Sequence, residues 1–459
     1  MSKFKLVEKL LWFYIILLPI REIPSLPFLN QKLQYADLVF IILFVACMIN
    51  YARGRFRFKW NWFDLSILFL LIAYLPSFYN SKNHLSSIIE LSGLIYLISL
   101  YLLIKNIIDT KEKFIFLTKI WVITGVVVSL IGMIALAICW MIGQLRTNAF
   151  LFYTEVEATY HILPRIDSVF RNANMYANYL LVSIVFAFIL LYYNFENKRK
   201  RFLIICALAI MFLGAFLAGS RQQVGIYLSS FLILSKFDKN RIFPVLRRLA
   251  FFVFLALLVV GILTTVWTVA PVNFKNNIEK GIFKVEMNSK YSWHIFTQHA
   301  SINMIKRHPI VGVGLGNYKD NFTAYVDWER AESSYHFIIP SYKKLVKDKK
   351  LVLDPLSTYL GSFAETGLIG FMALSILLAS FAISLFNFYK NRLNNFSRQL
   401  SWFILSGFFG FLINGFIIEI LTMRHFWIMM AMGMSSTYLR ANSDTLSNRG
   451  GKTKNENDR

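Results

Sequence analysis

The sequence predicts an all-α polytopic membrane protein with about 12 transmembrane helices, and three observations support this fold class. Of the 459 residues, 56% are hydrophobic and 16% are charged, whereas soluble domains carry about 25% charged residues. The mean hydropathy is +0.52. Apolar runs of roughly 16 to 25 residues follow one another along the chain, and a helix needs about 20 residues to cross a bilayer core. These observations exclude a single soluble domain.

The spans are predicted to start near Leu10, Asp37, Asp64, Ser86, Phe114, Tyr176, Phe202, Gln222, Leu249, Leu356, Leu400 and Glu419. Lys and Arg are distributed unequally between the connections: the set that includes both termini holds 27, and the short loops of the other set hold 8. This is the positive-inside pattern, which predicts that both termini are cytoplasmic. Topology therefore explains most of the net charge of +24, and nucleic acid is not expected as a partner.

The predicted organisation is one membrane domain over residues 1–440 and a polar, disordered cytoplasmic tail over residues 441–459. A large outer loop, residues 272–355, separates spans nine and ten. Its helical periodicity from about His294 to Arg307 indicates an ordered cap rather than a linker.

The three cysteines, Cys47, Cys139 and Cys206, all fall within predicted spans. They form neither a disulfide framework nor a CxxC metal signature. We expect no metal and no cofactor.

The first polar motif is the segment Gly219 to Gln223 (GSRQQ), which separates two apolar runs on the outer side. An arginine at the end of a span can simply extend to the membrane interface. Arg221, however, has almost no loop around it and lies on the side that positive charge avoids, which favours an anionic partner. Because a guanidinium binds two phosphate oxygens at once, Arg221 is a candidate phosphate ligand.

The second motif runs from Arg165 to Ala177 (RIDSVFRNANMYA) and leads into the sixth span from the same side. Asn174 has two interpretations. It could be the N-cap of the following helix, or it could join Arg171 in a sugar or phosphate site at a helix N-terminus.

The third motif, His308 to Tyr318 (HPIVGVGLGNY), lies in the large outer loop. Its glycines superficially match a dinucleotide-binding fingerprint, but no βαβ unit surrounds them and the compartment is wrong. We expect a tight turn after a helix that Pro309 ends, with the glycines approaching the spans closely.

The fourth motif opens the next span: Asp354 to Leu360 (DPLSTYL), followed by Glu365 to Gly370 (ETGLIG). Asp354 before Pro355 predicts a helix N-cap with Pro at the first helical position. Glu365 lies about two turns into the span, and an intramembrane acid is a candidate functional residue.

Taken in order, the S-R pair, RNANMYANYL, HPIVGVGLGNY and DPLSTYLGSFAETGLIG resemble the O-antigen ligase and polymerase superfamily. The resemblance covers residues 165–375. It implies a GT-C-like arrangement of about a dozen helices in the bacterial inner membrane, with a large outer loop. It also implies a metal-independent, inverting glycosyltransferase that moves a glycan from undecaprenyl diphosphate to an acceptor. The acceptor is the lipid A core for a ligase and a second lipid-linked repeat unit for a polymerase, and the product is O-antigen, capsule or exopolysaccharide.

The resemblance assigns roles residue by residue. Arg221 matches the S-R arginine, a diphosphate ligand. Counting back from Pro309 to the family's second arginine leads to His294, with Lys290 close by. The family's histidine between D-P and S-T-Y-L corresponds to Leu356.

Leucine cannot exchange a proton, so another group must serve the acceptor hydroxyl or the chain is inactive. The expected catalytic residues are Arg221, His294, Asp354 and His336. The expected substrate-binding residues are Arg165, Arg171, Asn174, Lys290, Gly314, Asn317, Tyr359 and Glu365.

Two other functions stay open. A flippase or exporter of lipid-linked sugars would also need basic groups, although along the spans on both sides of the midplane rather than at the outer face. A catalytically degenerate, glycan-binding member is the other alternative, which Leu356 favours. Polymerases and ligases share these motifs, so both activities remain candidates.

Overall fold

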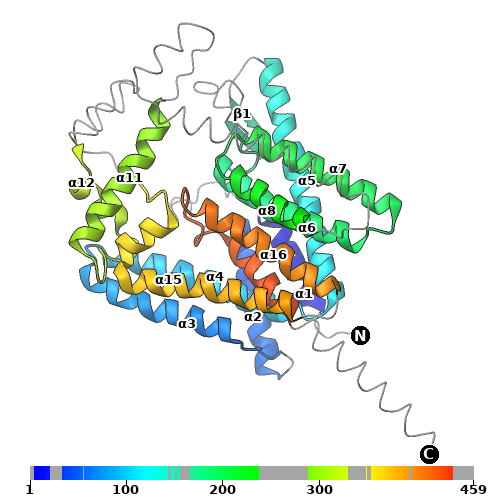
Figure 1. Cartoon of the computed structure of the whole chain (residues 1–459), viewed down its shortest axis with the longest axis horizontal. Helices are drawn as coiled ribbons and strands as arrows, with labels where there is room; N and C mark the ends of the chain where they lie inside the picture. Colours follow the sequence, from blue (N-terminus) through cyan, green and yellow to red (C-terminus); the bar gives the residue numbers. More distant parts are fainter. Residues whose placement is uncertain are drawn as a thin grey trace, which may run out of the picture.

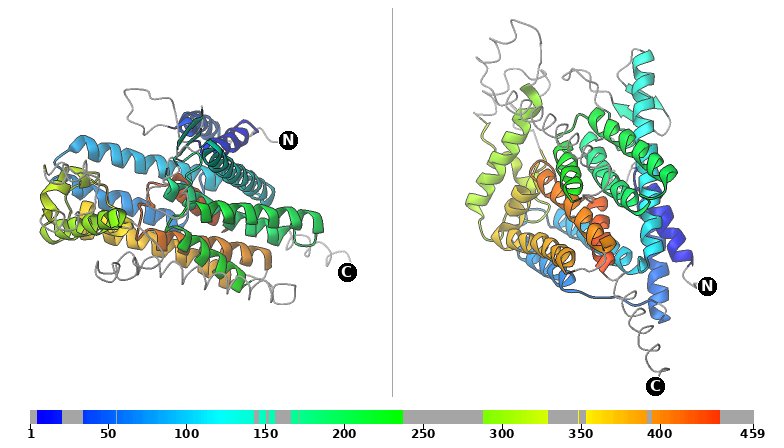
Figure 2. Two further views of the ribbon diagram at one scale, coloured as in Figure 1. Left: turned by 90° about the horizontal axis from the view of Figure 1, so that it is seen from above. Right: turned by 45° about the vertical axis from the view of Figure 1, so that its right-hand side comes forward.

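The computed structural model describes residues 5–20, 34–54, 56–142, 146–149, 152–155, 166–170, 172–236, 288–328, 348, 353–391 and 395–437. In these residues the helices pack side by side in one bundle (Figures 1 and 2). The elements are α1 (Lys5–Leu17), α2 (Tyr35–Ala52), α3 (Trp62–Tyr74), η1 (Leu75–Asn80), α4 (His84–Ile107), α5 (Lys111–Ile142), β1 (Arg146–Ala149), β2 (Phe152–Glu155), α6 (Ala173–Tyr193), α7 (Lys198–Leu217), α8 (Gln223–Ser235), α11 (Asn288–Arg307), α12 (Tyr318–Tyr325), α15 (Thr358–Lys390) and α16 (Asn395–Asn414). Residues 424–437 form a further helix.

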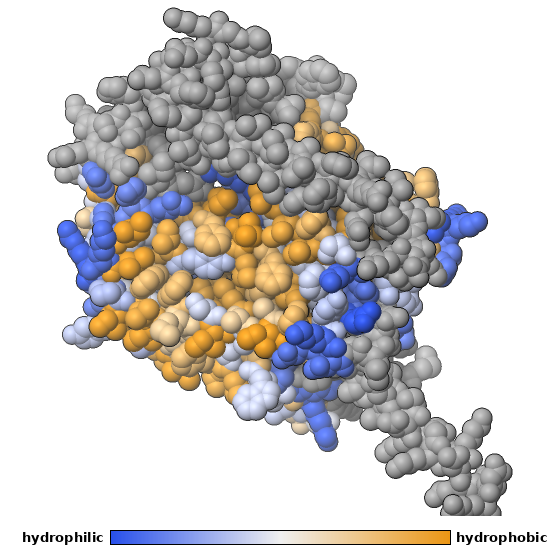
Figure 3. Space-filling view, in the orientation of Figure 1, coloured by the Kyte–Doolittle hydropathy of each residue, from blue (hydrophilic) through white to orange (hydrophobic). Residues whose placement is uncertain are grey.

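Within the described residues, 7 helices are long and apolar enough to cross a membrane: α2, α3 continued by η1, α4, α5, α6, α7 and α15. Apolar side chains cover the middle of the face in Figure 3, with hydrophilic residues toward its edges. The chain is a multi-pass helical membrane protein. The count of about 12 spans stays a prediction; the span near Leu249 lies outside the described residues. The antiparallel hairpin of β1 and β2 is an addition that the all-α prediction lacked.

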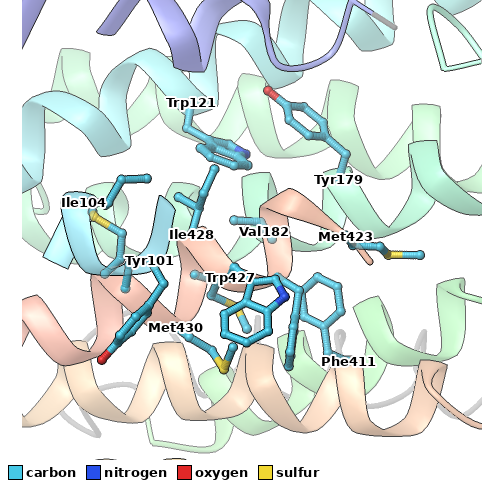
Figure 4. Close-up of a cluster of buried hydrophobic side chains, with 14 of the residues drawn as sticks. Tyr101, Ile104, Trp121, Tyr179, Val182, Phe411, Met423, Trp427, Ile428 and Met430 are labelled. Atoms are coloured by element: carbon cyan, nitrogen blue, oxygen red, sulfur yellow. The ribbon is translucent and has the colours of Figure 1, made fainter. Parts of the chain in front are cut away.

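The core of the bundle is built around α6, which packs against α5, α7, α8 and α16. Of the residues in its apolar window, 89% are buried. Trp121 of α5 stacks on Tyr179 of α6 with ring centroids 5.2 Å apart, and Trp427 lies in the same cluster (Figure 4). Since α6 meets so little lipid, its polar residues interact mainly with neighbouring helices.

Two buried ion pairs tie helix ends together. Lys105 Nζ lies 2.5 Å from Asp64 Oδ2, with side-chain exposures of 0% and 1%. Arg424 donates from Nη2 to both carboxylate oxygens of Asp37 at 2.8 Å. Each acid lies in the first turn of a span, α2 or α3, so each pair joins the start of a span to another helix.

The segment 272–355, which the sequence predicts to be an outer loop, contains α11 and α12; these helices pack against each other and against α15 at one end of the bundle (Figure 1). The predicted periodicity from about His294 to Arg307 is confirmed, because α11 extends over Asn288–Arg307. Helices α11 and α12 therefore lie beside the span that the DPLSTYL motif opens.

Candidate functional site

The third and fourth motifs interlock through the backbone. Helix α15 is broken at Gly367 (φ 64°, ψ −165°), and such a break interrupts its internal hydrogen bonding. The loop after Pro309 supplies four bonds at this break: Val313 N–H to Ala364 O (2.9 Å), Gly314 N–H to Glu365 O (3.0 Å), Leu368 N–H to Pro309 O (2.8 Å) and Ile369 N–H to Ile310 O (3.3 Å). A broken helix is tolerated at membrane depth only where its backbone groups are satisfied again, and here the outer loop satisfies them.

The glycines of the third motif form the predicted close approach. A Cβ on Gly312 would lie 2.3 Å from the carbonyl carbon of Glu365, and one on Gly314 would lie 2.8 Å from Cα of Ser81. Both residues have positive φ, at 72° and 108°. Only glycine meets both conditions, so the expected tight turn against the spans is confirmed.

Glu365 holds the end of this loop. Its two carboxylate oxygens accept the backbone N–H groups of Gly316 and Tyr318, both at 3.1 Å. Asn317 between them is buried and donates to Ser81 and Ser87 at 2.9 and 2.8 Å. Glu365 and Asn317 were expected to bind substrate, and in the structure their side chains bind the protein's own loops.

The predicted N-cap of α15, Asp354, is wrong. The N-cap of this helix is Ser357, whose Oγ accepts from the Leu360 N–H. Asp354 instead lies in an ion pair with Lys319 of α12, 2.9 Å away, and its side chain is 63% exposed. The helix begins three residues later than the D-P pair suggests because Ser357 competes for the cap.

The S-T-Y residues of this motif bind the loop that follows α16. Thr358 N–H donates to Gly415 O at 2.8 Å, and its Oγ1 donates to Ile418 O at 2.7 Å. The Tyr359 hydroxyl donates to Leu412 O at 2.7 Å. These bonds hold the last turn of α16 and residues 415–418 against the first turn of α15.

The S-R motif forms the turn between α7 and α8. Gly219 has φ 53°, a conformation that favours glycine. Ser220 and Gln222 are buried on either side of Arg221, which is half-buried. Gln223 donates from Nε2 to Phe216 O at 3.0 Å and so caps the end of α7. The neighbours of Arg221 thus hold the turn that presents its guanidinium.

This turn is joined to the second motif and, through α16, to the fourth. Ser220 Oγ donates to Asn174 Oδ1 at 2.8 Å. Asn414 Nδ2, at the end of α16, donates to the Gln222 carbonyl at 3.1 Å. The next residue, Gly415, accepts from Thr358. The N-cap of α6 is Asn172, which accepts from the Asn174 N–H at 2.8 Å, so the N-cap interpretation of Asn174 is wrong.

Glu419 is a residue that the motifs did not reveal. It lies in the loop between α16 and the helix at 424–437, outside the membrane helices. Its Oε2 would lie 3.5 Å from a Cβ on Gly361, a position that also contacts Pro355, so the carboxylate sits beside the first turn of α15. Burial, followed by the negative charge of Glu90, raises the pKa of Glu419 from 4.5 to about 8. Its only sequence signal was an acid at the start of a predicted span.

The family model for O-antigen ligase matches residues 206–375, from α7 to the middle of α15. The resemblance to the O-antigen ligase and polymerase superfamily is confirmed. No curated protein matches the chain. The O-antigen ligase segment contains the S-R turn and both interlocking motifs, whereas Asn174 and Glu419 lie outside it and reach it through the contacts above.

Several predicted site residues of this O-antigen ligase relative fall outside what the structure describes. They are Arg165, Arg171 and His336, together with the side chains of Lys290 and His294, whose backbone belongs to α11. Gly314 and Tyr359 are engaged in the contacts given above. Among the described residues, no group of three or more His, Cys, Asp or Glu is arranged to hold a metal ion.

Proposed function

We propose that this protein transfers a glycan from an undecaprenyl-diphosphate carrier to an acceptor hydroxyl, as a polymerase or ligase of surface polysaccharide. The O-antigen ligase match places the chain in polysaccharide biosynthesis in general. One observation supports the finer proposal. Asn414 donates to the Gln222 carbonyl in the turn of Arg221, and the next residue in the chain, Gly415, accepts from Thr358 N–H. The turn that carries a candidate phosphate ligand is thereby connected to the DPLSTYL motif, where the family's histidine would stand.

In the proposed reaction, the acceptor oxygen attacks the anomeric carbon of the donor sugar and the bond to the diphosphate oxygen breaks. Attack opposite the leaving group inverts the configuration. Negative charge grows on the departing lipid diphosphate, where the Arg221 guanidinium stabilises it more in the transition state than in the ground state. A base accepts the proton of the acceptor hydroxyl. Arg171, Lys290 and His294 are proposed to assist at the diphosphate.

Glu419 is our candidate for that base, in place of the histidine that Leu356 replaces. A base operating near neutral pH needs a pKa near the working pH, and that of Glu419 is raised to about 8. Asp354 is less suited because Lys319 pairs with it at 2.9 Å. His336 and His294 remain candidates in the same loop.

We further propose the bacterial inner membrane as the location, with both termini cytoplasmic. The proposed partners are the lipid-linked glycan as donor and either the lipid A core or a second lipid-linked repeat unit as acceptor. The glycan that accumulates when the protein is deleted separates the two activities. Single repeat units on the carrier indicate a polymerase, and finished polymers on the carrier indicate a ligase.

Substitution of Arg221 tests the function. Removing one donor to a developing oxyanion typically costs about 100- to 1,000-fold in rate, so Arg221→Ala should lose that much glycan transfer by the purified full chain. The matched control is Arg201→Ala in the first turns of α7, where the guanidinium donates to Phe195 O at 3.3 Å. Undiminished transfer by Arg221→Ala would overturn the role.

Two further measurements test the alternative functions. Glycan transfer by the wild-type protein in detergent, with no second compartment, excludes an exporter. Transfer that appears only in Leu356→His would indicate a catalytically degenerate member.

A further inference from the structure

A buried network of polar side chains lies where α6, α8 and α16 meet, and we call it the amide network. Its members are Asn174, Asn178, Ser220, Gln222 and Asn414. Asn178 and Asn414 are 0% and 1% exposed, and Ser220 and Gln222 are 4% and 1% exposed. Burying polar side chains in an apolar bundle costs free energy unless they are hydrogen-bonded. Polar residues inside membrane proteins are therefore candidates for a functional role.

Asn414 is the centre of the amide network. Its Nδ2 donates both to Asn178 Oδ1 at 2.8 Å and to the Gln222 carbonyl at 3.1 Å. Gly225 leaves room for this side chain, since a Cβ there would lie 2.6 Å from Asn414 Oδ1. One amide therefore joins the last turn of α16 to α6 and to the residue after Arg221.

Two polar atoms of the amide network lack a hydrogen-bond partner within it. Gln222 Nε2 and Asn414 Oδ1 are buried and have no hydrogen-bond partner among the residues that the structure describes. A polar cluster whose only task is stability pairs its buried groups or is replaced by apolar residues. Each unpaired buried group in a native structure calls for an explanation, and a functional role is one of them.

Hydrogen bonds of Asn414 and its neighbours hold both sides of Arg221 and reach the first turn of α15. Its bond to Gln222 fixes the backbone immediately after Arg221, and the Ser220 hydroxyl bond to Asn174 fixes the backbone immediately before it. The residue after Asn414, Gly415, accepts from Thr358 N–H at 2.8 Å in the first turn of α15.

We propose that Asn414 is a positioning residue that sets the Arg221 turn relative to the first turn of α15, so that the lipid diphosphate is held in line with the acceptor. This inference rests on the proposed function, in which Arg221 binds the diphosphate. Asn414 itself touches no substrate and acts through Gln222 and Gly415.

Binding of undecaprenyl diphosphate to the purified full chain in detergent tests this role. Asn414→Leu removes the hydrogen bond to the Gln222 carbonyl in the turn and the one to Asn178 in α6, and we expect the Kd to rise by about tenfold or more. Asn106→Leu is the matched control, because Asn106 is also buried and also joins two elements, accepting from Lys59 N–H at 2.7 Å. Both variants should lose thermal stability, and only Asn414→Leu should lose affinity. Equal affinity loss in both would overturn the proposal.

A second variant separates positioning from packing. Asn414→Asp keeps the size of the side chain, but its ionised carboxylate repels the two carbonyl oxygens that Nδ2 served. When protonated, it regains one O–H donor, and burial favours that protonated form. The affinity ratio to wild type should therefore recover as the pH falls from about 9 to about 6.

The charged and titratable groups around this position include Arg221 on the adjoining turn, Glu419 in the loop that follows α16, and His425, whose ring packs on Phe411 of α16 and Tyr179 of α6. Wild type contains the same three groups, so their contribution cancels from the ratio. A ratio for Asn414→Asp that does not change with pH would overturn the proposal.

The double variant distinguishes this proposal from the function on which it rests. If Asn414 acts through Arg221, Arg221→Ala with Asn414→Leu should bind no more weakly than Arg221→Ala alone. Wild-type affinity in Arg221→Ala would overturn the proposed function. Weak binding by Arg221→Ala with wild-type binding by Asn414→Leu would overturn the positioning role only.

Discussion

The carboxylate of Glu365 accepts the backbone N–H of Tyr318 at 3.1 Å, which joins an acid inside a broken membrane helix to the first residue of a helix in the outer loop. Its other oxygen accepts from Gly316 at the same distance. Burial raises the pKa of the Tyr318 phenol, whose hydroxyl donates to Thr297 O at 2.6 Å in α11. Glu365 therefore anchors both outer helices to α15.

Removal of this anchor should loosen the outer loop. Glu365→Ala leaves two partly buried N–H groups without an acceptor, at about 1–3 kcal/mol each. We expect a lower melting temperature in detergent and faster proteolysis within α11, and a smaller change in Glu365→Gln, which keeps one acceptor oxygen. The control is Glu112→Ala, at an exposed position of α5. Unchanged proteolysis in Glu365→Ala would show that the four backbone bonds suffice.

The break in α15 makes Gly367 irreplaceable. Gly367→Ala requires φ 64° for a residue with a side chain and places Cβ 2.2 Å from Ile310 O. We expect a loss of several kcal/mol, of the order of severe core substitutions, measured as melting temperature and folded yield. Gly93→Ala is the control, because a Cβ at this position of α4 meets nothing within 4 Å. That variant should be neutral or slightly stabilising.

The buried pair of Lys105 and Asp64 predicts a non-additive result. Lys105→Met leaves the Asp64 carboxylate buried without its cation, with the Tyr101 hydroxyl and the Asn61 backbone N–H as its donors, both at 2.8 Å. Removal of one partner of such a pair costs about 3–5 kcal/mol. The double variant Lys105→Met with Asp64→Leu should recover most of this loss. Thermal unfolding of the four proteins measures the coupling, and strictly additive losses would contradict it.

Glu419 predicts a pH-dependent activity. As a base it works when deprotonated, so glycan transfer should rise with pH through about 8, the value of its raised pKa. Glu419→Gln should lose about 100- to 10,000-fold in rate, as expected for a general base, whereas Asp354→Asn should lose much less. Full activity of Glu419→Gln would rule out this role and return attention to His294 and His336.

Stability should move in the opposite direction. Because folding raises the pKa of Glu419, the folded chain binds this proton more tightly than the unfolded chain. Its contribution to stability is fully present below the ordinary value of 4.5 and is lost as the pH rises through about 8. The melting temperature of Glu419→Gln should therefore fall less between these two values than that of wild type.

The sequence was most informative where a pattern is local. Apolar length predicted the membrane helices, periodicity predicted α11, and the HP and glycine pattern predicted a tight turn against the spans. It was wrong about Asp354 as a helix cap, and of its two interpretations of Asn174 the cap was the wrong one, because another capping residue stood within three positions of each. Neighbouring Asn and Ser residues compete for a cap, and only the backbone conformation decides between them.

By itself the sequence determined that this chain is a helical membrane protein, that its polar motifs resemble those of the O-antigen ligase superfamily, and that Arg221 stands among them. Only the tertiary structure decided which side chains hold that site together. Asn414 and Glu419 are more than 190 residues from Arg221 in the chain, at separations that no local pattern encodes. They reach the site because α16 packs between α8 and α15, and the backbone groups freed at the helix ends and at Gly367 must find partners inside the bundle.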